Sequence, residues 1–270
     1  MQTVLTIAGY DPSSGAGISA DLMVFAAHQL FGTSCITSLT IQSTIGVRSN
    51  HPIAPEILGA TLDYLDADLP PAGIKIGMLG SAPLVKAVAE YVARVQSRHP
   101  LVPVVLDPVL RSSSGRELLS AEGLELLRSH LLPLVDWVTP NLAELSLLTG
   151  YPVNHRADLL PAAQALQRTY PRLTVFATGG HLDPPDDLVC TAEGEEIWLA
   201  GEHVSTTSTH GTGCALSSAF LCRLVLGDSA RAAAESAKRY VSEALRTATP
   251  IGHGNGPLNH LWPLKSHQRR

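Results

Sequence analysis

Short apolar runs alternate along the chain with segments whose apolar side chains recur every three or four residues. The runs are rich in β-branched residues and nearly continuous, which is typical of strands buried on both faces. They lie at Thr3–Ala8, Ser34–Ile41, Gly73–Ile76, Val102–Leu106, Trp137–Thr139 and Leu173–Phe176. Helical spacing is clear from Ile18 to Leu30. Further helices are predicted at Pro55–Ala67, Ala82–Gln96, Ser120–Leu131, Ala157–Tyr170 and Ser229–Ala248.

This alternation predicts an α/β fold, with a mostly parallel sheet covered by helices on both faces in three αβα layers. Two short runs, Asp187–Ala192 and Glu195–Ala200, flank a Glu-Gly pair and predict a small late hairpin. There is no internal repeat and no long linker, so one domain over residues 1–262 is expected. The remaining residues, 263–270, are expected to form a flexible tail.

Composition narrows the class of partner. The formal net charge is -5, which argues against general affinity for nucleic acid. No apolar run approaches the roughly 20 residues needed to span a bilayer, so no membrane partner is expected. The four cysteines form no CxxC pair or metal-ligand spacing, which favours a reduced, cytoplasmic protein.

The most informative segment is Thr209–Cys214, which reads THGTGC and precedes a run of small and apolar residues. It predicts a glycine-rich turn that opens into a helix. The amide groups of such a turn lack intrahelical acceptors and, with the helix dipole, form an anion site. Gly211 and Gly213 have no Cβ to keep a phosphate away.

A second glycine-rich segment, Ala8–Leu22, joins the first predicted strand to a helix. A turn with a serine N-cap explains it without any function. Asp21 lies one turn into that helix, where a carboxylate could face a cleft; first-turn acids are also common for dipole reasons.

Three further polar positions follow predicted strands. Asp107 ends a hydrophobic strand, where a charge is costly unless it has a partner. Asn141 and Glu144 match a helix capping box, and Glu144 also suits a magnesium site beside phosphates. Gln42, at the end of the second strand, offers a donor and an acceptor to a heteroaromatic edge.

Taken in order, these segments resemble the hydroxymethylpyrimidine/phosphomethylpyrimidine kinases of the ribokinase-like superfamily. That family reads AG-D-SGGAGI-ADL, T-QNT-GV, K-GML, DPV, VTPN--E, KGGH, THGTGC and a closing GHGHGPLNH. The corresponding segments here are Ala8–Leu22, Gln42–Val47, Lys75–Leu79, Asp107–Val109, Val138–Glu144, Gly179–His181, Thr209–Cys214 and Gly252–His260. The similarity keeps its order from residue 3 to about residue 260.

The resemblance implies a ribokinase-like fold and transfer of the ATP γ-phosphoryl group to 4-amino-5-hydroxymethyl-2-methylpyrimidine and then to its monophosphate, for thiamine synthesis. It also implies Mg²⁺ and a homodimer. The catalytic positions would be Gly211, Thr212, Gly213 and Cys214. The substrate positions would be Gly9, Asp21, Gln42, Met78 and Val109. The nucleotide positions would be Asn141, Thr178, Gly180, Thr209 and Lys238, and the metal positions Asp107 and Glu144.

Cys214 stands where many ribokinase relatives place an aspartate base. A free thiol has a pKa of about 8.5, and a helix N-terminus favours its thiolate. The residue could accept the substrate hydroxyl proton or only orient that hydroxyl. It could also be a small residue packed at a helix start.

The similarity fails at three places that normally carry positive charge. Thr178 replaces the lysine of KGGH, Ser113 replaces a lysine that follows DPV, and Thr206–Ser208 replaces the frequent TKN. Arg111 is a candidate to compensate, because arginine binds phosphate through two hydrogen bonds.

Two other functions remain open from the sequence. A pyridoxal kinase shares this fold and much of the anion site, and pyridoxal is a similar flat heterocycle with a hydroxymethyl group. A catalytically silent pyrimidine-binding protein would explain the missing lysines, although the persistent anion site disfavours it.

Overall fold

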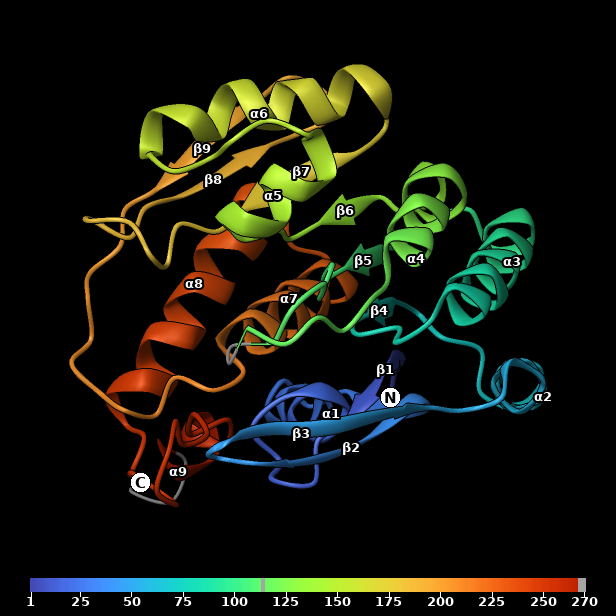
Figure 1. The fold of residues 1–270 in the computed structure, drawn as a ribbon, viewed down its shortest axis with the longest axis horizontal. Coiled ribbons are helices and arrows are strands. Elements are labelled where there is room, and N and C mark those ends of the chain that lie inside the picture. Colours follow the sequence, from blue (N-terminus) through green and yellow to red (C-terminus); the bar gives the residue numbers. More distant parts are fainter. Residues whose placement is uncertain (113–114, 267–270) are drawn as a thin grey trace.

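Nine strands form one sheet in the computed structural model, which describes residues 1–112 and 115–266 (Figure 1). The strands are β1 (Thr3–Tyr10), β2 (Phe31–Ser43), β3 (Gly46–Pro52), β4 (Ile74–Ile76), β5 (Val104–Leu106), β6 (Trp137–Val138), β7 (Thr174–Ala177), β8 (Asp187–Cys190) and β9 (Glu196–Leu199). Their order is β3-β2-β1-β4-β5-β6-β7-β8-β9. Neighbouring strands from β2 to β7 in that order pair in parallel. Strand β3 pairs antiparallel with β2, β8 with β7, and β9 with β8.

The helices are α1 (Gly17–Ala27), α2 (Pro55–Asp68), α3 (Ala82–Arg98), α4 (Ala121–Leu126), α5 (Leu142–Thr149), α6 (Arg156–Thr169), α7 (Thr212–Val225), α8 (Ala230–Arg246) and α9 (Trp262–Ser266). Helices α1–α6 lie between strands along the chain, and α7–α9 follow the last strand. A π-helical turn, η1 (Leu127–Leu131), and a 3₁₀ turn, η2 (Leu132–Leu134), continue α4. None of the described helices is long and apolar enough to cross a membrane.

Two hydrophobic cores lie on opposite faces of the sheet. Because side chains alternate along a strand, Val104 and Leu106 pack into one core and Val105 into the other. Helices α2, α3, α5 and α6 contribute to the first core, and α1, α7 and α8 to the second. The predicted three-layer α/β fold with a mostly parallel sheet and a late hairpin, β8–β9, is therefore confirmed.

Strand β3 was not predicted from the sequence. It pairs antiparallel with the end of β2, and its residues include Arg48, Asn50, His51 and Pro52. These side chains are half-buried or exposed, so no apolar run or alternation marks the strand. As a result β2 extends to Ser43 and carries Gln42 into a hairpin at the edge of the sheet.

The predicted C-terminal tail is partly helical. Residues 263–266 belong to α9, and Trp262 Nε1 donates a hydrogen bond to the Tyr240 carbonyl at 3.1 Å. Residues 267–270 lie outside the described residues. The single-domain boundary at residue 262 stays a prediction.

Candidate active site

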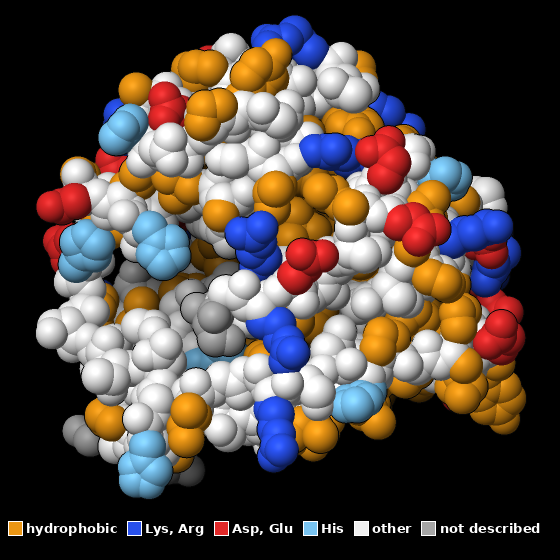
Figure 2. Space-filling model, viewed as in Figure 1, with side chains coloured by type: hydrophobic (Ala, Val, Ile, Leu, Met, Phe, Trp, Pro, Cys, Tyr) orange, Lys and Arg blue, Asp and Glu red, His pale blue; other side chains and the backbone are white. Residues whose placement is uncertain are grey.

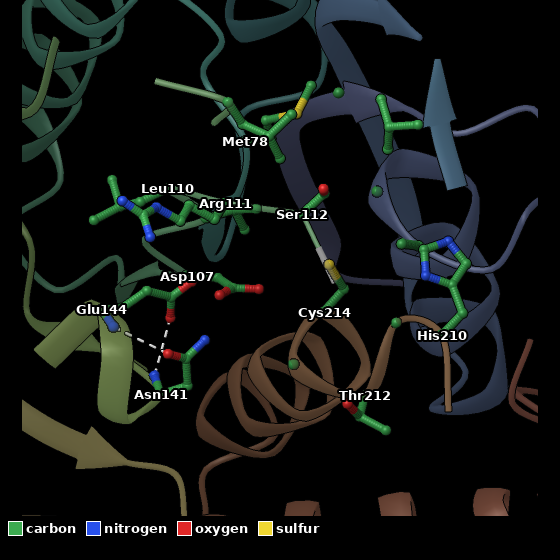
Figure 3. Close-up of a pocket in the computed structure, with 18 of the residues that line it drawn as sticks. Met78, Asp107, Leu110, Arg111, Ser112, Asn141, Glu144, His210, Thr212 and Cys214 are labelled. Atoms are coloured by element: carbon green, nitrogen blue, oxygen red, sulfur yellow. Dashed lines mark hydrogen bonds between the residues drawn. The ribbon is translucent and has the colours of Figure 1, made fainter. Parts of the chain in front are cut away.

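A cavity of about 700 Å³ opens at the carboxyl ends of the parallel strands, where ligands bind in sheets of this kind. Most of the predicted site residues line it. They are Gly9, Gln42, Met78, Asp107, Val109, Asn141, Glu144, Thr178, Thr209, Gly211, Thr212, Gly213 and Cys214. Figure 3 shows Asp107, Asn141, Glu144 and Arg111 on one side of this cavity, with Cys214 and His210 on the other.

The predicted glycine turn lies at the N-terminus of α7. Gly211 is its N-cap and has a left-handed backbone, with φ of 89°. A Cβ at this position would lie 1.9 Å from the carbonyl oxygen of Gly15. The two glycine-rich segments therefore pack backbone against backbone, and the first-turn amides of α7 border the cavity without intrahelical acceptors.

Cys214 joins the two sides of the cavity. Its thiol lies near the Asp107 carboxylate and the Gly17 amide. Burial raises the pKa of Cys214 to about 12, because the nearby Lys75 charge only partly offsets burial and the Asp107 carboxylate adds to it. This direction is opposite to the expectation that the helix N-terminus favours a thiolate.

Asp107 and Glu144 form a buried pair of carboxylates. Asp107 follows β5, and Glu144 lies in the first turn of α5, where the predicted capping box with Asn141 is present. Asn141 Oδ1 accepts from the Glu144 amide at 3.0 Å, and Glu144 Oε2 accepts from the Asn141 amide at 2.9 Å. Burial raises the pKa of Asp107, and burial together with the Asp107 charge raises the pKa of Glu144 to about 8.

These residues fit a magnesium ion that keeps several water ligands. Carboxylate oxygens are hard donors, and a cation would relieve the raised pKa values. The Thr139 hydroxyl is also buried beside the cavity and has no hydrogen-bond partner in the described chain. Across residues 1–112 and 115–266, no group of three or more His, Cys, Asp and Glu side chains is arranged to hold a metal ion. A magnesium ion at this site would therefore have water among its ligands as well as protein oxygens.

Asp21 does not line the cavity, contrary to expectation. Its carboxylate is fully buried and binds Lys75 Nζ at 2.9 and 3.1 Å. The hydroxyls of Thr6 and Ser218 donate to it at 2.6 and 2.7 Å. Burial lowers the pKa of Lys75, but Asp21 and the other acidic groups nearby, Asp107 among them, together outweigh burial and raise it. Lys75 is therefore a charged group of the cavity floor.

Two predicted nucleotide positions also lie off the cavity. Lys238 Nζ binds Asp187 at 2.7 Å and the Pro185 carbonyl at 3.0 Å, in a separate groove beside β9. Gly180 is exposed and does not line the cavity, although Thr178 and His181 do. Ser113 lies outside the described residues.

The cavity lining also includes Lys75, Asp11 and His210, which were not assigned a role in the predicted site. Lys75 and Asp11 stand inside quoted motifs, and His210 is the second residue of THGTGC. Arg111 also lines the cavity, and its guanidinium forms no ion pair within the described residues. The motif positions were visible in the sequence, but the pairing of Asp11 with His210 was not.

A family model described as phosphomethylpyrimidine kinase matches residues 11–259. The chain belongs to the phosphomethylpyrimidine kinase family. It is 40% identical over 261 residues to the hydroxymethylpyrimidine/phosphomethylpyrimidine kinase of Synechococcus elongatus, covering 96% of this chain and 97% of that protein. It is also 40% identical to the Escherichia coli enzyme of the same name, covering 95% and 96%.

Solved structures of two kinds of kinase share the fold of this family member. The ADP complex of Bacillus subtilis pyridoxal kinase has a TM-score of 0.86 at 28% identity, covering 98% of this chain and 99% of that one. The phosphomethylpyrimidine kinase of Clostridium difficile has a TM-score of 0.77 at 33% identity, covering 91% and 100%. The ribokinase-like fold is confirmed, and the fold alone does not separate the two acceptors.

Proposed function

We propose that this chain transfers the γ-phosphoryl group of ATP to 4-amino-5-hydroxymethyl-2-methylpyrimidine and then to its monophosphate, producing the pyrophosphate for thiamine synthesis. The proposal rests on one observation: a single cavity is lined by the glycine turn at residues 209–214, by the Asp107 and Glu144 carboxylates, and by Gln42. Relatives of matching length, about 40% identical, bear the name of this activity.

The pyrimidine is proposed to lie against Gly9, Gln42, Met78 and Val109. A Cβ on Gly9 would lie 2.3 Å from Met78 Cε, so glycine lets the methionine pack against the strand end. Met78 and Val109 thus offer apolar surface near the polar Gln42 amide in the same cavity, a combination that suits an aromatic ring with a polar edge. Asp21 contributes indirectly by holding Lys75 in the cavity floor.

In the reaction, the hydroxymethyl oxygen attacks the γ-phosphorus, the bond to the β-γ bridging oxygen breaks, and ADP leaves. The amides of residues 211–214 stabilise negative charge on the transferred group. Cys214 holds the acceptor oxygen in line, and the hydroxyl proton passes to solvent with the product. Mg²⁺, held by Asp107 and Glu144 largely through water, would neutralise phosphate charge.

The nucleotide is proposed to contact Asn141, Thr178 and Thr209, which border the cavity on the side of the carboxylate pair and the anion turn. Arg111 is proposed to bind phosphate in place of the absent lysines. Lys75 already balances Asp21, so Arg111 supplies the uncompensated positive side chain within the described lining.

We also propose a cytoplasmic homodimer that forms through the β2–β3 hairpin. Leu39 and Ile41 point to one side of β2 and are 49% and 54% exposed, and Ile45 in the adjoining turn is 76% exposed. Such neighbouring apolar side chains favour a protein contact. On the face in Figure 2, basic and acidic side chains are interspersed, without a continuous basic patch for nucleic acid. Light scattering of the purified chain tests the dimer.

Pyridoxal is the rival acceptor, because pyridoxal kinases share this fold at a TM-score of 0.86. The test is a comparison of kcat/KM for the hydroxymethylpyrimidine and for pyridoxal at saturating ATP and Mg²⁺. We expect the pyrimidine to be preferred by at least tenfold. A preference for pyridoxal would assign the chain to vitamin B6 salvage instead.

A further inference from the structure

Two polar side chains from opposite ends of the chain meet at the rim of the cavity. His210 Nε2 lies 2.8 Å from Asp11 Oδ2, and the two side chains are only 13% and 4% exposed. The His210 amide donates to the Gly256 carbonyl at 3.0 Å. A Cβ on Gly15 would lie 2.2 Å from the imidazole ring. Backbone and ring are therefore both fixed.

The same ring nitrogen also contacts Gln42. Gln42 Nε2 lies 2.9 Å from His210 Nε2, so an amide nitrogen faces a ring nitrogen. One imidazole nitrogen either donates or accepts, so it cannot give a proton to Asp11 and take one from an amide N–H. Which amide atom faces the ring is thus decided by where the proton resides.

Asp11 decides that question. Burial opposes its ionisation, but hydrogen bonds from His210 and Ser13 outweigh burial and lower its pKa. Its Oδ1 accepts from the Ser13 amide and hydroxyl at 2.8 and 2.7 Å, and its Oδ2 from the Ala16 amide at 2.9 Å. An ionised carboxylate only accepts, so His210 Nε2 carries the proton.

The other end of the Gln42 amide supports the same orientation. Here Gln42 Oε1 lies 3.3 Å from the Thr40 hydroxyl, whose one proton goes to the nearer acceptor, the Tyr10 carbonyl at 2.9 Å. That hydroxyl can still accept a hydrogen bond. Exchanging the two amide atoms therefore satisfies every group: the amide nitrogen donates to Thr40, and the amide oxygen accepts from His210.

We infer that Asp11 and His210 are positioning residues that turn the Gln42 amide so that its oxygen faces His210 and its N–H groups face Thr40 and the cavity. The inference rests on the proposed function for the identity of the ligand. A ligand atom that meets Gln42 is then a hydrogen-bond acceptor, such as a ring nitrogen of the aminopyrimidine.

The test is a double-mutant cycle with His210→Phe and Gln42→Ala. Phenylalanine keeps the ring packed against Gly15 and removes both nitrogens. We expect His210→Phe to raise KM for the hydroxymethylpyrimidine about tenfold to thirtyfold, the usual effect of one buried hydrogen bond, with a much smaller change in kcat. In the Gln42→Ala background the same substitution should add less than threefold. His210→Gln, which restores an N–H near the Nε2 position, should recover part of the loss.

His51→Phe is the matched control, because His51 lies on β3 outside the cavity. Calorimetric binding of the hydroxymethylpyrimidine without ATP and thermal melts accompany the kinetics. The inference would be overturned if the effects of His210→Phe and Gln42→Ala on KM were fully additive, or if kcat fell with KM unchanged. Product formation by the wild type would still uphold the proposed function in that case. Absence of product from the wild type, with pyrimidine binding still weakened by His210→Phe, would instead count against the proposed function alone.

Discussion

The two sides of the cavity differ in the groups that carry charge: one side presents backbone amides, and the other presents carboxylate side chains. On the side of α7, the proposed anion site consists of backbone amides, and its geometry depends on Gly211 packing against the Gly15 carbonyl. On the side of β5 and α5, the proposed metal site consists of the Asp107 and Glu144 carboxylates, whose pKa values are raised by burial. A backbone site does not titrate but tolerates no Cβ at the close contact. A carboxylate site tolerates small steric changes, but its charge varies with pH and with bound cations.

The largest effect is expected at Gly211, where alanine meets both a positive φ and a backbone oxygen 1.9 Å away. Gly211→Ala should lower kcat/KM at least about 100-fold, because misplaced amides no longer stabilise the transferred group. It should also destabilise the fold by about 1–3 kcal/mol. Steady-state kinetics and thermal melts measure both effects.

Gly213→Ala is the matched comparison on the same turn. The nearest atom to its Cβ is Asp107 Oδ2 at 3.9 Å, and its backbone is not left-handed. We expect an unchanged melting temperature and a smaller loss of activity. Equal losses of activity from the two substitutions would show that the close contact between Gly211 and the Gly15 carbonyl is not what the turn depends on.

Glu144→Gln should have the next largest effect, about tenfold to 100-fold on kcat/KM, with a higher Mg²⁺ requirement. Glu144 has a pKa of about 8 in the fold against an ordinary value of 4.5. The folded protein therefore holds this proton more tightly than the unfolded chain, so Glu144 makes stability fall as pH rises from about 4.5 to 8. In a chelator, Glu144→Gln should remove that part of the decline.

Chemical denaturation at pH 5 and pH 8 measures this pH dependence. Glu122→Gln, an exposed position on α4, is the control. If the Glu144 variant and the wild type lose the same stability between pH 5 and pH 8, folding does not raise the pKa of Glu144.

Arg111→Gln should have the smallest effect of the three. One guanidinium that binds phosphate without a protein partner should change KM for ATP or for the monophosphate about tenfold. Arg111→Lys should retain part of the affinity. Arg94→Gln, an exposed pair with Asp63, controls for loss of surface charge. Unchanged KM values in Arg111→Gln would mean that the chain tolerates the missing lysines without compensation.

The sequence was sufficient for features that depend on neighbouring residues. Apolar periodicity located the parallel strands and most helices, and the Asn141–Glu144 spacing located a capping box that the structure contains. Glycine spacing located the turn before α7. Each of these features forms within a few residues, so local pattern carries enough information.

The sequence was insufficient where a distant partner decides the outcome. Asp21 is drawn into the interior by Lys75, 54 positions away, and Lys238 is held by Asp187, 51 positions away. Asp11 and His210 meet across 199 positions. Strand β3 forms because the end of β2 offers hydrogen bonds, not because its own residues are apolar. Pairings of this kind follow from the tertiary fold.

The most direct test of the account is the time course of γ-phosphoryl transfer from ATP to the hydroxymethylpyrimidine, with products resolved by mass, for the wild type and Cys214→Ala. We predict that the wild type forms the monophosphate and then the pyrophosphate. Cys214→Ala should slow both steps about 100-fold while ATP binding is kept. A wild type that forms neither product, or a Cys214→Ala variant with undiminished rates, would contradict the account.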